Sequence, residues 1–402
     1  MALDLTSFAA ALKQHYTSDR VENMVYRDNP LLAMMQKYKQ FGGKNLPIPI
    51  IYGNPQGRSA TFSTAQANKT NSQLKDFVLT RNSDYSLASI SNEVLEASKG
   101  NSNAFMEAAT TEIDGAIQSA TRSLAIALYG TGSGNIGRIS SSTVLASTLV
   151  VLTNANDITN FEVGMKLVVS ATETGGAVKA GSVTISGIDR DAGTITISST
   201  LNVAIPTVAA NDFIYVQGDY DQKIKGLRAW LPDAAPSSTP FFSVDRTADV
   251  TRLGGIRFDG SAMPIEEALI AAASRVAREG GKPDYCFMDY SKFADLEKAL
   301  GSKVQYIDLK ANAEVGFRGI VINGPRGPIK VIPDQNCPSD RCFLLQLDVW
   351  KLYSLGDAPK ILDADGMKML RDSNADSVEV RVGYYAQLGC RAPGFNANVK
   401  LS

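Results

Sequence analysis

Residues 46–82 have the sequence LPIPIIYGNPQGRSATFSTAQANKTNSQLKDFVLTRN. Pro47 and Pro49 exclude a helix and a central β-strand at its start, because proline has no backbone N–H to donate. Between the two apolar ends, Gly53 to Ser72 form a polar stretch whose single large apolar residue is Phe62. Loops in compact domains usually span about 4–6 residues, and longer bare loops tend to be functional or disordered.

These residues predict a long projecting hairpin. At about 18 residues a side and roughly 3.3 Å per residue, it would extend on the order of 60 Å. The hairpin has too few apolar residues to form a core of its own. We therefore expect it to lie on a neighbouring molecule or to stay mobile. Phe77, Leu79, Tyr85 and Leu87 alternate with other residues and predict a long second strand with one apolar face.

Five residues of this region are candidate intersubunit contacts: Arg58, Phe62, Lys69, Lys75 and Arg81. Two interpretations of the basic residues stay open. They either contact acidic patches on adjacent copies of the chain, or they keep an exposed loop soluble.

Helical patterns lie on both sides of the hairpin. Residues 1–45 contain two short amphipathic stretches, the second at residues 30–35, and predict an arm that straps across a larger body. A short helix is expected over residues 91–100, between a capping serine and a glycine. The longest helix is expected to begin near Asn103, and its alanine-rich apolar stripe runs over residues 105–128.

Residues 139–220 are rich in Thr, Ser, Val and Ile and predict a small all-β unit inserted between two mixed regions. Its expected strands are Val163–Val169, a hairpin of Ser182–Ile188 with Thr194–Ser198, and Asp212–Val216.

The remainder alternates strands with helices. We expect a strand over Lys223–Leu231 and a helix over residues 264–280, which opens at a proline and ends at a glycine pair. The other expected elements are a strand at Pro283–Met288, a helix at Ser291–Leu300, and strands at residues 331–333, 343–347, 378–382 and 394–401.

Composition limits the possible functions. The chain has 402 residues with a formal net charge of -1, whereas proteins that grip nucleic acid usually carry a basic excess. The start lacks a basic segment ahead of an apolar stretch, so we expect no signal peptide. No segment is apolar enough to suggest a membrane span, and the four cysteines are expected to be free thiols in a reducing cytoplasm.

Catalytic and cofactor motifs are weak. The single histidine, His15, has no nucleophile motif beside it, and we interpret it as a solvated helix residue. Residues 132–137 match G-x-G-x-x-G, but a helix precedes them and β structure follows, the reverse of a dinucleotide site, so we expect a turn. We predict that the chain is not an enzyme and binds no cofactor.

Metal-binding patterns are equally incomplete. Cys337 and Cys342 lack the second pair that a structural zinc site needs, and we expect both to be buried. Residues 363–366 lack the closing glutamate of a calcium loop, so a β-turn is the expected structure. Asp219 and Asp221 could form a carboxylate pair, but a solvated turn is the interpretation we favour. We therefore predict no metal site.

The order of these parts resembles the α+β fold of major capsid proteins of tailed double-stranded DNA bacteriophages. The similarity includes local phrases at Asn29–Leu32, Tyr129–Gly132, Pro283–Asp289, Val331–Asp334 with Phe343–Leu347, and Gly383–Tyr384. In that family the hairpin is the extended loop, the long helix is the spine of the peripheral domain, and the later α/β region is the axial domain.

The resemblance implies a division of the chain, with an inserted β domain that departs from the minimal family pattern. The implied parts are an N-terminal arm (1–45), the extended loop (46–82), the peripheral domain with its spine helix (83–138), the inserted β domain (139–220), peripheral strands and a linker (221–262), the axial domain (263–372) and closing peripheral strands (373–402).

The resemblance also implies a function. Copies would self-assemble into pentamers and hexamers of an icosahedral virion capsid in the bacterial host cytoplasm, around double-stranded DNA that meets the inner face non-specifically. Further implied partners are separate scaffold, portal and decoration proteins, with no membrane. Some members cross-link through a lysine of the extended loop. Lys69 and Lys75 lie in that region, but no partner is identifiable and we predict no cross-link. The alternatives are another self-assembling virion protein, such as a tail tube or sheath, and an enzyme with an inserted β domain.

Overall fold

The computed structural model describes residue 25 and residues 28–93, 102–301, 306–310, 316–363, 369–372 and 375–401. The helices expected near the N-terminus and over most of residues 91–100 lie outside the described residues, as does His15. The chain divides into two compact units, residues 1–125 with 230–402, and residues 126–229. We call them unit 1 and unit 2 and describe each separately.

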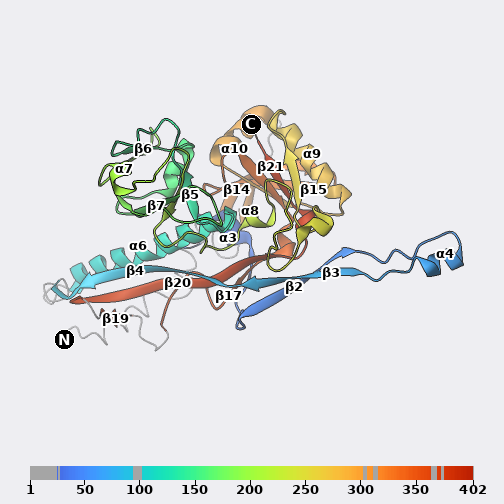
Figure 1. Ribbon diagram of the computed structural model, residues 1–402, viewed down its shortest axis with the longest axis horizontal. Helices are drawn as coiled ribbons and strands as arrows, with labels where there is room; N and C mark the ends of the chain where they lie inside the picture. The colour runs from blue at the N-terminus through green and yellow to red at the C-terminus, as the bar shows by residue number, and fades with distance from the viewer. Residues whose placement is uncertain are drawn as a thin grey trace. The chain divides into compact units, whose positions relative to one another are not determined.

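The first sheet of unit 1 is built around one long strand, β20 (Ser377–Cys390). β4 (Asn82–Ser91) pairs antiparallel with the first ten residues of β20, from Ser377 opposite Ser91 to Ala386 opposite Asn82. β17 pairs with the rest of β20, as Figure 1 shows. The other strands and helices of this region are α3 (Pro30–Met34), β1 (Gln36–Tyr38), η4 (Leu347–Val349), β17 (Trp350–Ser354), β18 (Lys360–Ile361) and β19 (Leu370–Arg371).

The long helix α6 (Ser102–Tyr129) confirms the long helix expected to begin near Asn103. Within unit 1 it buries Ile113, Ile117 and Leu124, which recur at helical spacing. Asp84 of β4 joins this helix to the sheet, because its Oδ2 accepts hydrogen bonds from Ser123 Oγ at 2.6 Å and Tyr384 Oη at 3.2 Å. One face of the β4–β20 ribbon therefore lies under α6.

A second, seven-stranded sheet in unit 1 has the order β11-β21-β16-β12-β15-β14-β13. Two helices pack with it around a shared core, in which Ala272, Val276 and Leu296 are fully buried. The helices expected over residues 264–280 and Ser291–Leu300 are confirmed. The elements of this region are η2 (Arg246–Asp249), β11 (Ile256–Asp259), α9 (Ile265–Arg278), β12 (Tyr285–Met288), α10 (Tyr290–Leu300), β13 (Tyr306–Lys310), β14 (Gly316–Gly324), β15 (Gly327–Pro333), β16 (Arg341–Leu345), η5 (Pro393–Phe395) and β21 (Ala397–Lys400).

Unit 2 holds a six-stranded sheet with the order β5-β10-β7-β8-β9-β6. A bridge between Ile139 and Leu152 links the two outermost strands, so the sheet closes on itself around one apolar core. The expected hairpin is confirmed as β8 with β9. The elements are β5 (Asn135–Arg138), β6 (Leu149–Val151), η1 (Ala155–Asn160), β7 (Lys166–Ser170), β8 (Val183–Asp189), β9 (Thr194–Ile197), α7 (Leu201–Ala204), β10 (Phe213–Val216) and α8 (Leu227–Trp230).

The prediction of one continuous apolar face from Phe77 to Leu87 is wrong. Phe77 and Leu79 are buried, but Tyr85 and Leu87 are about half exposed, at 51% and 57%. The chain changes pairing partner at Arg81, from the hairpin to β20, and the buried positions of the new strand are even-numbered. A one-residue change of phase moves every side chain to the opposite face.

The strand expected over Lys223–Leu231 is also wrong, because this segment ends in the short helix α8. Ile224, Leu227 and Trp230 are buried three residues apart, which is helical spacing. Gly226 lies against the backbone carbonyl groups of Ala127 and Leu128, where a β-carbon would overlap. The apolar residues of Lys223–Leu231 are therefore buried, but in a segment that ends in a short helix rather than in a strand.

Candidate intersubunit finger

The predicted hairpin is present in unit 1 as β2 (Asn45–Gly53) and β3 (Gln73–Thr80). The strands are antiparallel, with Asn45 opposite Thr80 and Gly53 opposite Gln73. A short helix, α4 (Phe62–Ala67), lies at the far end (Figure 1). We call residues 45–80 the finger, residues 54–72 its tip, and residues 45–53 with 73–80 its root.

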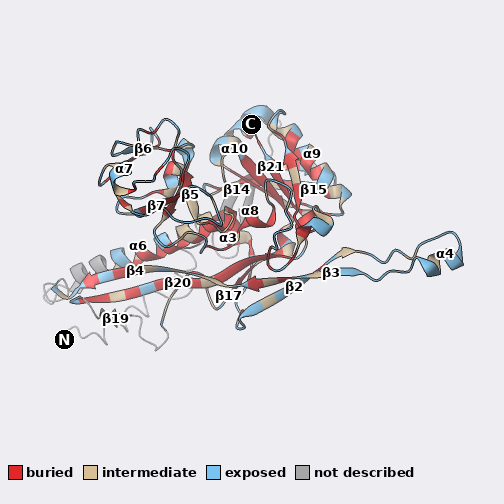
Figure 2. Ribbon diagram, viewed as in Figure 1, coloured by how far each residue is buried: buried red, intermediate tan, exposed pale blue. Residues whose placement is uncertain are grey.

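The root is part of the core of unit 1 (Figure 2). Ile48, Phe77 and Leu79 are at most 4% exposed, and Ile48 pairs directly with Phe77. Their packing depends on Gly389 of β20, where an added β-carbon would lie 2.8 Å from Ile48 Cδ1 and 2.9 Å from Leu79 Cδ1. The absence of a side chain at this position lets the finger lie directly on the sheet.

An aromatic cluster anchors the root. Phe77 packs against Trp230 and Phe241, with ring centroids 5.1 and 6.2 Å apart. Trp230 in turn contacts Phe242 at 5.6 Å and Trp350 at 6.3 Å. Such pairs contribute about 0.5–1.5 kcal/mol each beyond the area that they bury. The cluster fixes the place at which the finger leaves the body.

A buried cation closes this cluster. The Arg246 guanidinium lies 4.1 Å over the Phe241 ring and donates to the Trp230 carbonyl at 3.3 Å. Burial, with a smaller contribution from nearby Arg257, lowers the pKa of Arg246 to about 10. Arg246 therefore stays protonated at neutral pH and keeps its cation–π contact. The sequence analysis missed this group, because its members are spread over residues 77–350 and share no local spacing.

Two arginines fix the ends of the finger: one binds the backbone of β2, and the other, directly after β3, binds a carbonyl ahead of β2. Arg252 donates from Nη1 to the Tyr52 carbonyl at 2.6 Å, at the outer end of β2. Arg81 donates from Nη1 to the Phe41 carbonyl at 2.5 Å and lies 5.2 Å over the Phe41 ring. The root is therefore fixed by packing and by charged hydrogen bonds together.

The tip has no core. None of the residues of α4 is buried, and Phe62 is 83% exposed. The tip does have local hydrogen bonds, such as that from the Gln56 backbone N–H to Thr70 Oγ1 at 2.8 Å. These bonds organise the tip without shielding Phe62 from water.

The five predicted contact residues fall into two groups. Arg58, Phe62 and Lys69 are together on the tip and are exposed. Lys75 lies in the root near Asp245, whose pKa is lowered by hydrogen bonds from Thr247 and, to a smaller extent, by the charge of Lys75. Arg81 contacts its own chain, as described above. The structure thus brings three of the five together on a free surface.

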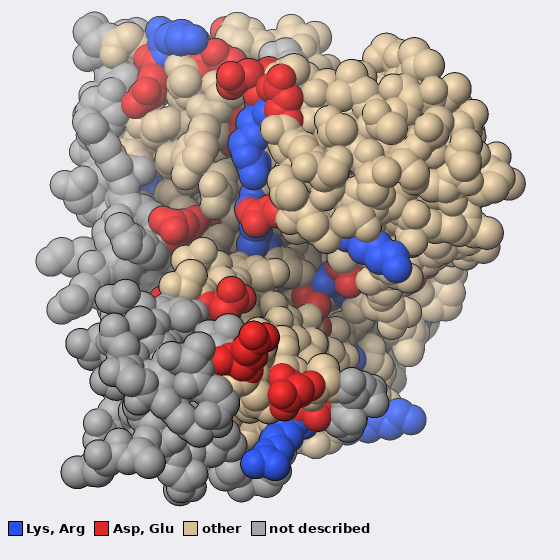
Figure 3. Space-filling view, turned by 90° about the vertical axis from the view of Figure 1, so that its left-hand side faces the viewer, with Lys and Arg blue, Asp and Glu red and all other residues tan. Residues whose placement is uncertain are grey.

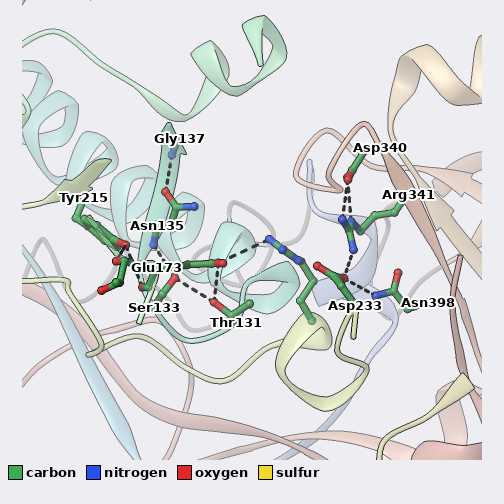
Figure 4. A network of polar contacts seen from close by, with 12 residues as sticks. Thr131, Ser133, Asn135, Gly137, Glu173, Tyr215, Asp233, Asp340, Arg341 and Asn398 are labelled. Carbon is green, nitrogen blue, oxygen red and sulfur yellow. Dashed lines mark hydrogen bonds and ion pairs between the residues drawn. The ribbon is translucent and has the colours of Figure 1, made fainter. Parts of the chain in front are cut away.

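The G-x-G-x-x-G motif of residues 132–137 has a packing role. Gly132 and Gly134 have φ angles of 92° and 79°, and a β-carbon on Gly134 would overlap the Asp219 carbonyl. Nearby, Glu173 Oε1 accepts from Thr131 Oγ1 at 3.0 Å, and Tyr215 Oη donates to the Glu173 carbonyl at 3.0 Å (Figure 4). These contacts fix the turn at residues 132–134, as expected, whereas residues 135–137 already belong to strand β5.

The acidic pairs are also structural. Asp219 pairs with Lys223 at 3.0 Å, and Asp221 Oδ2 accepts from the Gly175 backbone N–H at 3.0 Å. In unit 1, Arg341 joins Asp233 to Asp340, and Asn398 Nδ2 donates to Asp233 Oδ1 at 2.8 Å (Figure 4). Of the possible calcium loop at residues 363–366, only Asp363 is among the described residues.

The described part of the chain holds no cluster of three His, Cys, Asp or Glu side chains placed to bind a metal. The cysteines, Cys286, Cys337, Cys342 and Cys390, are buried and unbridged. Burial raises the pKa of the Cys337 thiol well above its usual value, so it is a poor nucleophile. Among the helices described, none has the length and apolar character that crossing a bilayer requires. One face of the molecule, in Figure 3, carries acidic and basic side chains interspersed, without a continuous basic surface.

Comparison with known proteins gives a consistent result. Residues 207–369 match the family model of the SU10 major capsid protein. The capsid chain of cyanophage A-1(L) is similar over 93% of this chain and 92% of its own, with a TM-score of 0.53 and 14% identity. The capsid of an empty GTA particle covers 93% of this chain and 90% of its own, with a TM-score of 0.46 and 9% identity. No curated protein matches the sequence. At this identity, the likeness to the cyanophage chain establishes a shared fold.

Proposed function

We propose that this chain is a tailed-phage major capsid protein and that it builds an icosahedral shell by laying each finger on a neighbouring copy. The fold and the family match over residues 207–369 support the proposal. The proposed role is structural rather than enzymatic. The proposal adds pentamers and hexamers as the assembling units and double-stranded DNA as the enclosed cargo. It also adds the bacterial cytoplasm as the place of assembly.

One observation carries the role of the finger. A buried root holds a tip that contains no buried helical residue and an 83% exposed phenylalanine. Conformational order in such a segment has to be stabilised by contacts, because fixing each residue costs about 1–2 kcal/mol of backbone entropy. A second copy of the chain supplies those contacts in a closed shell, where weak contacts repeat across many subunits.

The charge of the chain suits this arrangement. A net charge of -1 limits repulsion among many copies packed side by side. Arg58 and Lys69 give the tip a local positive charge, since residues 53–72 contain no Asp or Glu. We propose that they pair with carboxylates of the neighbouring copy, and that Lys75 and Arg81 mainly position the finger.

The roles of the other parts follow the family pattern. We propose that residues 83–138, 221–262 and 373–402 form the peripheral domain and residues 263–372 the axial domain. Residues 139–220 would be an inserted domain that stabilises the subunit or decorates its surface. Scaffold, portal and decoration proteins are proposed partners, and contact with DNA at the inner face would be non-specific.

Deletion of residues 57–70 tests the proposal. The shortened finger should leave a folded, soluble subunit that no longer forms closed shells in negative-stain electron microscopy. A circular-dichroism spectrum like that of the full chain is the folding control. Closed shells of normal size from the deletion variant would refute the role of the finger. Tubes from the full chain would favour the tail-tube or sheath alternative instead.

A further inference from the structure

A hollow of about 230 Å³ lies in unit 1 beside the root of the finger. One wall is the end of β2, with Ile50, Ile51 and Tyr52. The opposite wall is η5 with the residues before it, including Ala392 and Phe395. Pockets for small molecules usually measure about 300–1,000 Å³, so this hollow is better suited to one side chain than to a ligand.

The composition of the hollow is that of a protein-binding pocket. Aliphatic and aromatic residues line it together with the charged residues Arg252, Glu279 and Arg391. A mixture of apolar and charged groups is usual around an anchor residue at a protein interface. Ile51, on the wall, is 61% exposed, so a partner that covers it would bury apolar surface and gain binding free energy.

The hollow can also accept a cation. Arg252 Nε lies 3.7 Å from Asp249 Oδ2 and 4.0 Å from Glu279 Oε2, so two carboxylates share one guanidinium at long distances. Such exposed pairs are weak, about 0–1 kcal/mol. Arg391 also lines the hollow, so two arginines balance the two carboxylates there. Arg58 or Lys69 of the tip would pair with a carboxylate that Arg252 holds only weakly.

The tip cannot fill the hollow of its own chain. β2 and β3 stay paired as far as Gly53 and Gln73, and α4, which begins at Phe62, lies at the far end of the finger (Figure 1), whereas the hollow is lined by residues 50–52 and 54 of the finger. Phe62 has the highest exposed fraction, 83%, among the exposed large apolar side chains described in the chain. Burial of a phenylalanine is worth about 1.5–3 kcal/mol, and burial of this one requires another molecule.

We infer that Phe62 of one copy inserts into the hollow at the root of the next copy's finger, between Ile51 and Ala392, with Arg58 or Lys69 beside Glu279. The inference rests on the proposed function and specifies its contact. Repeated from copy to copy, it links each tip to the following root. This head-to-tail contact is heterologous, and such contacts close into rings when the rotation permits.

Covalent trapping tests this contact. The double variant Phe62→Cys with Ala392→Cys, assembled into shells and treated with a flexible bis-maleimide, should give a ladder of linked subunits on denaturing gels. The four natural thiols are buried and will not compete in the folded state. Val203→Cys is the matched control, since Val203 is an apolar residue with 74% exposure that does not line the hollow, and it should give no ladder with Phe62→Cys.

A third pair, Phe62→Cys with Leu87→Cys, probes the other exposed apolar surface, the outer face of β4. Shells that form without a ladder from the Ala392→Cys pair would overturn the inference and leave the proposed function intact. A ladder from the Leu87→Cys pair instead would also overturn the inference. So would a cross-link between Phe62→Cys and Ala392→Cys of the same chain. Failure of the unaltered chain to form any shell would contradict the proposed function.

Substitutions of Phe62 keep the inference testable if the cysteine variants do not assemble. Because Phe62 is exposed in the subunit, its replacement leaves the fold unchanged. Phe62→Leu should assemble almost normally, whereas Phe62→Asp should lower shell yield at least tenfold. Normal shells from Phe62→Asp would overturn the inference.

Discussion

Phe77→Ala and Phe62→Ala make the same chemical change at two positions of one finger, and we expect opposite results. Phe77 is fully buried, with its ring 5.1 Å from Trp230 and 6.2 Å from Phe241. Truncation of a buried phenylalanine costs about 3–5 kcal/mol, because it removes burial and leaves a cavity. Phe62 is 83% exposed, and its truncation should change the free energy of unfolding by less than about 0.5 kcal/mol.

The assay is urea unfolding of unassembled subunits, followed by tryptophan fluorescence. The chain has two tryptophans, Trp230 and Trp350, and both belong to the cluster that Phe77 contacts. The signal therefore reports on the root and on unit 1. Phe77→Ala should move the midpoint to clearly lower urea, and Phe62→Ala should leave it in place while reducing shell formation. An unchanged midpoint for Phe77→Ala would refute the assignment of the root to the core.

Three further predictions address the root, a buried carboxyl group and unit 2. Gly389→Ala should lower the free energy of unfolding by about 1–3 kcal/mol in the same assay, because its β-carbon would lie 2.6 Å from Tyr353 Cε2; an unaffected variant would contradict the close packing. Burial raises the pKa of Asp284 above its ordinary value of 3.8, so its ionisation costs stability; the stability of the natural chain relative to Asp284→Asn should fall as the pH rises above that ordinary value, and a rise would contradict the sign. Residues 130–228 expressed alone should unfold in one cooperative thermal transition by circular dichroism, because they form their own closed sheet and core; a disordered product would show that unit 2 depends on unit 1.

The finger could be predicted from the sequence because its constraints are local. Pro47 and Pro49 restrict the backbone directly, and the polar composition of residues 53–72 is visible without any contact. The helices α6 and α9 could also be predicted from the sequence, since each has a continuous apolar stripe between recognisable ends. The candidate contacts Arg58, Phe62 and Lys69 followed from the finger itself.

Long-range packing could not be predicted in the same way. The change of face between Leu79 and Tyr85 depends on β20, nearly 300 residues away, which replaces the hairpin as the pairing partner. The aromatic cluster joins Phe77 to Trp230 and Trp350, and nothing near any one of them indicates the others. Gly389 gave no sequence signal, because its role depends on the side chains that lie above it.

The central claim is that the tip, residues 54–72, acquires its contacts from another copy. Hydrogen exchange of the tip amides, measured on dilute subunits and on assembled shells of the same chain, tests it most directly. The account predicts rapid exchange in the subunit and slow exchange in the shell, with the root amides at Val78 and Leu79 slow in both. Equal protection of the tip in subunit and shell would contradict it.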